Sequence, residues 1–183
     1  MLEKNWNDLI TPSNVVITAK DGDIKGTVVA EPIERGYGLT IGNSLRRVLL
    51  SSLQGAAITA IKIENVLHEF STIPGVREDV VDLILNIKNI SVKSHTEATS
   101  KVSLNAKGPC QVTAGMIQSN ANIEIKNTDL IICHLDKDSE LNIEFTINTG
   151  RGYSPAANNK PEDAPIGLIP IDAIFSPIKT VSY

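Results

Sequence analysis

The sharpest alternation of apolar and polar residues lies late in the chain and predicts a β-strand. Between residues 141 and 148 every second position is apolar, namely Leu141, Ile143, Phe145 and Ile147. Successive side chains of a strand point to opposite faces, so this pattern indicates a strand with one buried face. Residues 57–64 alternate in the same way, with one set of positions turning polar at the end, and predict a second strand.

Two other stretches carry apolar residues at helical spacing. From residue 40 to 53 a stripe about 100° wide is expected to face the core, and Gly55 is expected to end this helix. Its members are Ile41, Leu45, Val48, Leu49 and Ser52. A second helix follows Pro74 and Gly75 and is expected to pack on a sheet through Val80, Leu83, Ile84 and Ile87. Glu78 and Asp79 fall in its first turn, where carboxylates favour the helix dipole.

Most of the remaining apolar segments are predicted to be extended. Residues 15–20 and 24–30 predict a hairpin around the turn pair Asp21-Gly22. Short strands are expected around Val92 and at residues 102–104, 123–125 and 131–135, a loop at 150–167, and extended segments at 171–175 and 178–181. Short strands separated by turn residues are typical of antiparallel sheets. The sequence therefore predicts an α+β fold, mainly of antiparallel sheets, with two principal helices.

Composition excludes several classes of function. The 183 residues suit one large domain or two small ones, and 17 basic against 21 acidic residues leave a net charge of −4. Direct DNA binding is not expected, because the positive charge that neutralises phosphates is missing. No secretory signal or apolar span is present, and Cys110 and Cys133 are too few and too far apart for a zinc site. We expect a cytoplasmic protein with buried thiols.

Two glycine-containing segments invite a comparison with anion-binding loops. Gly36, Gly38 and Gly42 precede and enter the first helix, but their spacing is one residue too long for a dinucleotide-binding turn. A strained turn with close helix packing is the favoured interpretation, and a nucleotide-binding enzyme stays an alternative. Residues 150–155 could bind an anion through backbone N–H groups, although an ordered loop that packs Tyr153 is preferred.

No titratable residues show the spacing of an active site. His68, His95 and His134 are scattered, without a second ligand at the spacing that a metal needs. The carboxylates Glu78, Asp79 and Asp82 are explained by helix capping and a solvated face. We therefore predict no catalytic residue, no metal and no cofactor in this chain.

The first helix carries a candidate partner-binding surface. Asn43, Arg47 and Leu50 cluster on the side opposite the apolar stripe, so a leucine lies beside a guanidinium on a face expected to be solvated. Such pairs are typical of protein interfaces, and a lone exposed leucine is the competing explanation.

The run from Glu34 to Ser52, which reads ERGYGLTIGNSLRRVLLSS, resembles the first-helix signature of bacterial RNA polymerase α subunits. Residues 66–72, 75–79, 150–155 and 176–177 also look like this family and follow in the same order. The resemblance covers nearly the whole chain.

The resemblance implies a non-catalytic assembly scaffold of the transcription enzyme, in which the nucleotidyltransferase activity belongs to the complex. Such a subunit homodimerises and recruits the large β and β′ subunits. It implies a dimerisation domain at residues 1–52 and 179–183, interrupted by an inserted domain at 53–178. It places Tyr37, Ile41 and Val48 at the dimer interface, and the β contact at Arg47, Leu50, His68, Ser71 and Thr72. The β′ contact would involve Ser176, Pro177, Ile178 and Lys179.

The end of the chain departs from the resemblance. Family members continue beyond the position of Tyr183 into a dimer-forming helix, a linker and a DNA-binding domain. We therefore expect a fragment whose first helix exposes a hydrophobic face, so its own dimerisation is an open question. The alternative function is a stand-alone β-rich interaction module.

Overall fold

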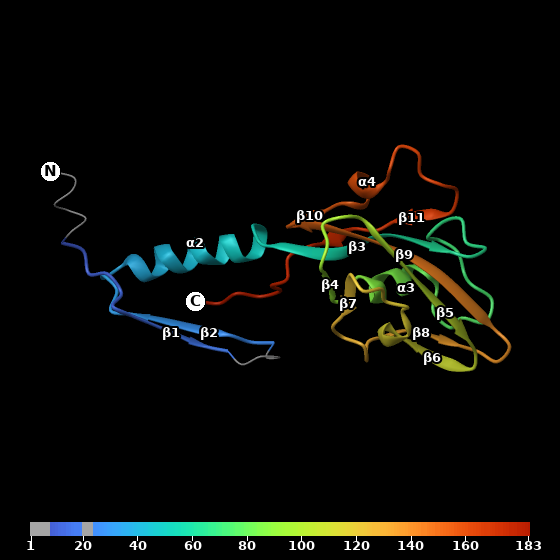
Figure 1. Cartoon of the computed structure of the whole chain (residues 1–183), viewed down its shortest axis with the longest axis horizontal. Coiled ribbons are helices and arrows are strands. Elements are labelled where there is room, and N and C mark those ends of the chain that lie inside the picture. Colours follow the sequence, from blue (N-terminus) through green and yellow to red (C-terminus); the bar gives the residue numbers. More distant parts are fainter. Residues whose placement is uncertain (1–7, 20–23) are drawn as a thin grey trace. The chain divides into compact units, whose positions relative to one another are not determined.

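The computed structural model describes residues 8–19 and 24–183 (Figure 1). The chain divides into two compact units. The first comprises the beginning of the chain through Val48 together with Val181–Tyr183, and the second comprises Leu49–Thr180. All buried residues of the described chain lie in the second unit.

The first unit contains a hairpin and most of a helix. Strands β1 (Asn14–Thr18) and β2 (Thr27–Glu31) pair antiparallel, which confirms the predicted hairpin. Its expected turn pair, Asp21-Gly22, lies outside the described residues. Helix α2 (Tyr37–Ser51) has no buried residue, so the prediction that its apolar stripe faces a core was wrong. The described part of this unit offers a two-stranded ribbon, which is not enough to bury the stripe.

One antiparallel sheet forms the centre of the second unit (Figure 1). Its strands follow the order β5-β9-β3-β4-β7, and β11 also pairs with β3. The bounds are β3 (Gln54–Ile63), β4 (Val92–Ser94), β5 (Ser100–Lys107), β7 (Ile123–Ile125), β9 (Glu140–Arg151) and β11 (Leu168–Pro170). The α+β class with mainly antiparallel sheets is thereby confirmed.

The two strands with the clearest sequence patterns are neighbours at the middle of this sheet. On β9 the predicted alternation is confirmed, since the apolar set around Phe145 is buried and the residues between are half-buried. On β3 every residue from Ala57 to Ile61 is buried, which indicates that both faces of this strand are covered. The core of the chain is built on this pair.

A smaller sheet and a helix complete the core. Strand β6 (Cys110–Thr113), which the sequence did not reveal, pairs with β8 (Ile131–Leu135), and the turn η1 (Ala114–Met116) follows β6. Helix α3 (Val80–Ile87) contacts β8 and buries Val80, Leu83 and Ile87, as its stripe predicted. Asp79 caps this helix by accepting a hydrogen bond from the N–H of Asp82 at 2.7 Å.

Two local predictions were wrong, and of the two segments predicted to be extended at 171–175 and 178–181 only the first contains a paired strand. Gly55 does not end a helix but lies within β3, where a Cβ would overlap the carbonyl oxygen of Phe175. Residues 150–167 are not only loop, since they contain β10 (Tyr153–Ser154) and the short helix α4 (Ala156–Asn159). Strand β10 pairs with β12 (Ala173–Ile174), whereas residues 178–181 carry no strand. These contacts join distant segments, so local patterns do not record them.

Within the part of the chain that the structure describes, no helix has the length and apolarity needed to cross a bilayer.

Candidate partner-binding surfaces

The α2 surface, defined as the exposed residues of helix α2, presents apolar side chains to solvent. The three residues assigned to a dimer interface, Tyr37, Ile41 and Val48, are all exposed, and Leu45 and Val48 expose 54% and 50% of their areas. Burying such side chains is favourable, by roughly 1.5–3 kcal/mol for a residue such as Val or Leu. The surface is therefore suited to a partner that covers it.

The second residue set predicted on this helix also reaches the surface. Arg47 is exposed and Leu50 is half-buried. They are three residues apart and Asn43 precedes Arg47 by four, so the three lie along one side of the helix. This arrangement offers one cationic and one apolar contact side by side.

Two glycines, one before α2 and one inside it, allow a left-handed backbone conformation and a close contact. Gly36 has a φ of +90°, a left-handed conformation that glycine adopts without steric cost. A Cβ at Gly42 would overlap the ring of Tyr183. The structure therefore shows a turn that favours glycine at Gly36 and close packing at Gly42, while a Cβ at Gly38 would meet no neighbour.

The HEFS loop, defined as residues 66–73, carries the predicted contact residues His68, Ser71 and Thr72. The Ser71 hydroxyl donates to the carbonyl of His68 at 2.8 Å, and the N–H of Val80 donates to the carbonyl of Ser71 at 3.2 Å. His68 and Thr72 are exposed, and Ser71 is half-buried. The loop is thus held by its own turn and by the start of α3.

Sequence reasoning missed two apolar residues in the HEFS loop. Leu67 and Phe70 expose 69% and 79% of their surface areas, more than ordinary core residues do. Their position among polar residues, in the run Leu-His-Glu-Phe-Ser, was the available signal, because no strand or helix period explains them. The loop therefore combines polar and apolar contacts.

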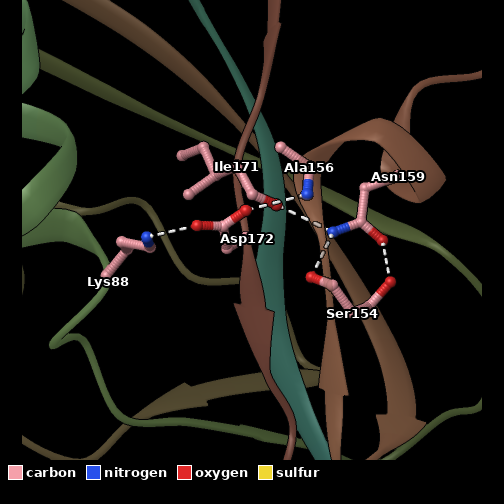
Figure 2. Close-up of polar contacts among 6 residues, drawn as sticks. All are labelled: Lys88, Ser154, Ala156, Asn159, Ile171 and Asp172. Carbon is pink, nitrogen blue, oxygen red and sulfur yellow. Dashed lines mark hydrogen bonds and ion pairs between the residues drawn. The ribbon is translucent and has the colours of Figure 1, made fainter.

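The return segment, defined as residues 171–179, is anchored through Asp172 (Figure 2). Lys88 Nζ lies 2.8 Å from Asp172 Oδ2, and the N–H of Ala156 donates to Asp172 Oδ1 at 2.9 Å. The hydrogen bond from Lys88, aided by that from Ala156, lowers the pKa of Asp172 below its ordinary value. One carboxylate thus joins the end of α3, the start of α4 and the return segment.

A second anchor lies beside the first. The side-chain amide of Asn159 donates to the carbonyl of Ile171 at 2.7 Å, and the Ser154 hydroxyl donates to Asn159 Oδ1 at 2.8 Å (Figure 2). Tyr153, by contrast, exposes most of its surface, so the expectation that the loop packs this ring was wrong. The loop is ordered by polar contacts instead.

The four predicted β′-contact residues follow at the end of the return segment. Ser176 closes a small turn, because its hydroxyl donates to the carbonyl of Ile178 at 3.0 Å. Pro177 and Lys179 are exposed, whereas Ser176 and Ile178 are half-buried. Their side chains are placed on the surface of the second unit.

Residues 61–176, more than half of the chain, match the family model described as the RNA polymerase Rpb3/RpoA insert domain. The chain belongs to this family. It therefore carries a domain of RNA polymerase α-type subunits, which supports a role in polymerase assembly. The match includes the HEFS loop and most of the return segment, whereas α2 lies before it.

Within this RNA polymerase insert domain, the Glu78–His134 pair has a structural explanation. Glu78 Oε1 lies 2.6 Å from His134 Nδ1, and Glu78 Oε2 accepts from the N–H of His134 at 2.8 Å. Burial raises the pKa of Glu78, but the hydrogen bonds from His134 outweigh it and leave the pKa below its ordinary value of 4.5. Glu78 thus fastens β8 to the segment before α3, a role that its assignment to the helix start did not foresee.

The two cysteines of the insert domain do not form a reactive site. Cys133 is buried and Cys110 half-buried, both unpaired. Burial raises the pKa of Cys133 to about 12, which leaves it without thiolate reactivity at neutral pH. In the described residues, no three His, Cys, Asp or Glu side chains gather as metal ligands would.

Proposed function

We propose that this chain is an assembly scaffold of bacterial RNA polymerase that binds a second copy of itself and recruits the β and β′ subunits. The observation that carries the proposal is the family match together with the α2 surface, whose apolar residues remain partly or largely exposed in the described chain. The scaffold supplies contacts and no catalytic residue. The nucleotidyltransferase chemistry belongs to the assembled complex.

The proposed organisation has two parts. Residues 1–52 and 179–183 belong to the dimerisation and assembly domain, and residues 53–178 form the inserted domain. Exposure of Tyr37, Ile41 and Val48 supports their role as the dimer contact, because a second copy would remove these apolar side chains from water.

The proposed β contact combines the polar side of α2 with the HEFS loop. Arg47 and Leu50 supply a guanidinium next to an apolar side chain, and His68, Ser71 and Thr72 supply polar groups. Arginine and apolar anchors are common energetic centres of protein interfaces. The proposed β′ contact is made by residues 176–179, which the ordered return segment presents.

Arg47→Ala is the sharpest test of the β contact. We expect it to reduce co-purification of β by about tenfold, because an exposed interface arginine is lost without a core cavity. The measurement is the β recovered with tagged chain at matched concentrations in cells that produce both. Arg46→Ala is the matched control, since Arg46 is the neighbouring exposed arginine of the same helix, and it should retain β.

The folded state of both variants is checked by circular dichroism and thermal unfolding. If Arg47→Ala recovered as much β as Arg46→Ala, the assigned contact would be wrong. If the unchanged chain recovered neither β nor β′, the scaffold proposal itself would fail.

A further inference from the structure

A groove of about 1050 Å³ opens in the second unit where β3 and β4 separate. These strands are paired at one position, Ala56 with Val92. Gln54 and Gly55 line the groove from β3, and Lys93 and Ser94 line it from β4. Strand backbone therefore borders the groove on two sides, as in sites that accept an extended segment through main-chain hydrogen bonds.

The groove also has apolar contacts and a defined edge. Ile174 is 61% exposed and lines it together with the half-buried Val92 and Ile178. The edge carrying Ile174 and Ile178 is the return segment, which Lys88 and Asn159 hold in place (Figure 2). The volume of the groove, about 1050 Å³, lies at the upper end of the roughly 300–1,000 Å³ range of ligand pockets, which leaves room for a short extended segment.

Basic side chains dominate the charge of the groove. Among the described residues that line it, the acidic member is Glu97 and the basic ones are Lys88, Lys93, His95, Lys126 and Lys179. Lys88 is paired with Asp172 at 2.8 Å and Lys126 with Glu124 at 2.6 Å. Lys93 and His95 also interact with Glu124, so three basic side chains share this carboxylate, and Lys179 forms no ion pair in the described chain. Net positive charge therefore remains in the groove. This excess stands out in a chain whose net charge is −4.

We infer that this groove binds an extended acidic segment of the partner subunit proposed to contact residues 176–179. The inference rests on the proposed function, and it extends the contact from the return segment to the wall formed by Lys93, His95 and Lys126. Lys93 is the determinant of specificity, because it is an exposed cation that lines the groove from β4, beyond the position where β4 pairs with β3. Complementary charges of this kind steer association and select the partner.

A nucleic-acid strand is less well suited to the groove. Single strands are held by aromatic side chains that stack on bases, and the aromatic residue that lines the groove, Phe175, is 7% exposed. Exposed aliphatic side chains and strand edges favour a polypeptide.

The test compares two charge reversals in the whole chain, co-produced with β and β′. Lys93→Glu should lower the recovery of β′ by about tenfold, and the unchanged chain should lose β′ as salt concentration rises. Lys137→Glu is the matched control, because Lys137 is an exposed lysine that lies outside the groove and has no ion pair in the described chain. Its recovery of β′ should be unchanged, and circular dichroism should show that both variants are folded.

Direct binding separates this inference from the function on which it rests. Fluorescence anisotropy is measured with a synthetic peptide of alternating Glu and Val, a Lys-Val peptide and a single-stranded oligonucleotide. Selective binding of the Glu-Val peptide, weakened by Lys93→Glu, supports the groove. If the oligonucleotide binds more tightly than the peptides, or if no probe binds, the inference is overturned. If both reversals retain β′ and the unchanged chain still recovers β and β′, the groove is wrong and the scaffold function stands.

Discussion

The two units of this chain differ in whether their apolar side chains are buried. In the second unit the side chains of β3, β9 and α3 close around a core in which Phe145 is fully buried. In the first unit the hairpin strands and α2 carry valines, isoleucines and leucines, yet no described residue is buried. The difference shows that the second unit completes its own core, whereas the first unit leaves its apolar residues at the surface.

The largest expected effect is in the core of the insert domain. Phe145→Ala should reduce the free energy of unfolding by about 3–5 kcal/mol, because it leaves a cavity that the neighbouring strands cannot fill. Urea denaturation measures the loss. Phe70→Ala, which removes the same ring from an exposed site, should change stability by less than about 0.5 kcal/mol. If both variants lost the same free energy of unfolding, the distinction between a buried Phe145 and an exposed Phe70 would be wrong.

A smaller effect, on association rather than folding, is expected in the first unit. Val48→Asp should weaken self-association by about tenfold, because a charge would be buried against an apolar partner face. Sedimentation at several concentrations measures it, with Asn43→Asp as a control on the opposite side of α2. The urea midpoint of the insert domain should stay unchanged. A drop in that midpoint, with association intact, would show that Val48 belongs to a core instead.

The smallest effect concerns a polar contact within the insert domain. Glu78→Gln should cost about 1 kcal/mol at neutral pH, because the charge-assisted hydrogen bonds to His134 are weakened. The folded pKa of Glu78 lies below 4.5, so its contribution is present above that pH and is lost as pH falls through the folded value. Urea midpoints measured against pH should therefore converge in acid. A difference that stays constant down to the lowest pH would rule out this role for Glu78.

Sequence pattern predicted the elements that have strong periods. The alternation in β9 and the stripe of α3 were sufficient to place both, because these side chains meet one core at a regular interval. Strand β6 was missed because it begins directly after the turn residues Gly108-Pro109 and buries one side chain, Val112, so no alternation marks it. Gly55 was misassigned for another reason, since its neighbour Phe175 is far away in the sequence.

Some residues of the candidate surfaces could likewise be found from the sequence, and others could not. Arg47 and Leu50 could be selected from a helical wheel, since their relation depends only on the helical repeat. The exposed pair Leu67 and Phe70, the anchoring of Asp172 by Lys88, and the groove beside Lys93 were not visible in the sequence. Each of these features depends on how folding positions segments that are distant in the sequence.

The sequence by itself determined the family, the α+β class and the residues that form the central strands and helices. These follow from local periods and from long motifs in a constant order. The tertiary structure alone decided that Glu78 bonds to His134 and does not cap the helix, and that basic residues from three segments line one groove. Burial and pairing are properties of segments brought together by folding, and a local pattern does not specify which segments meet.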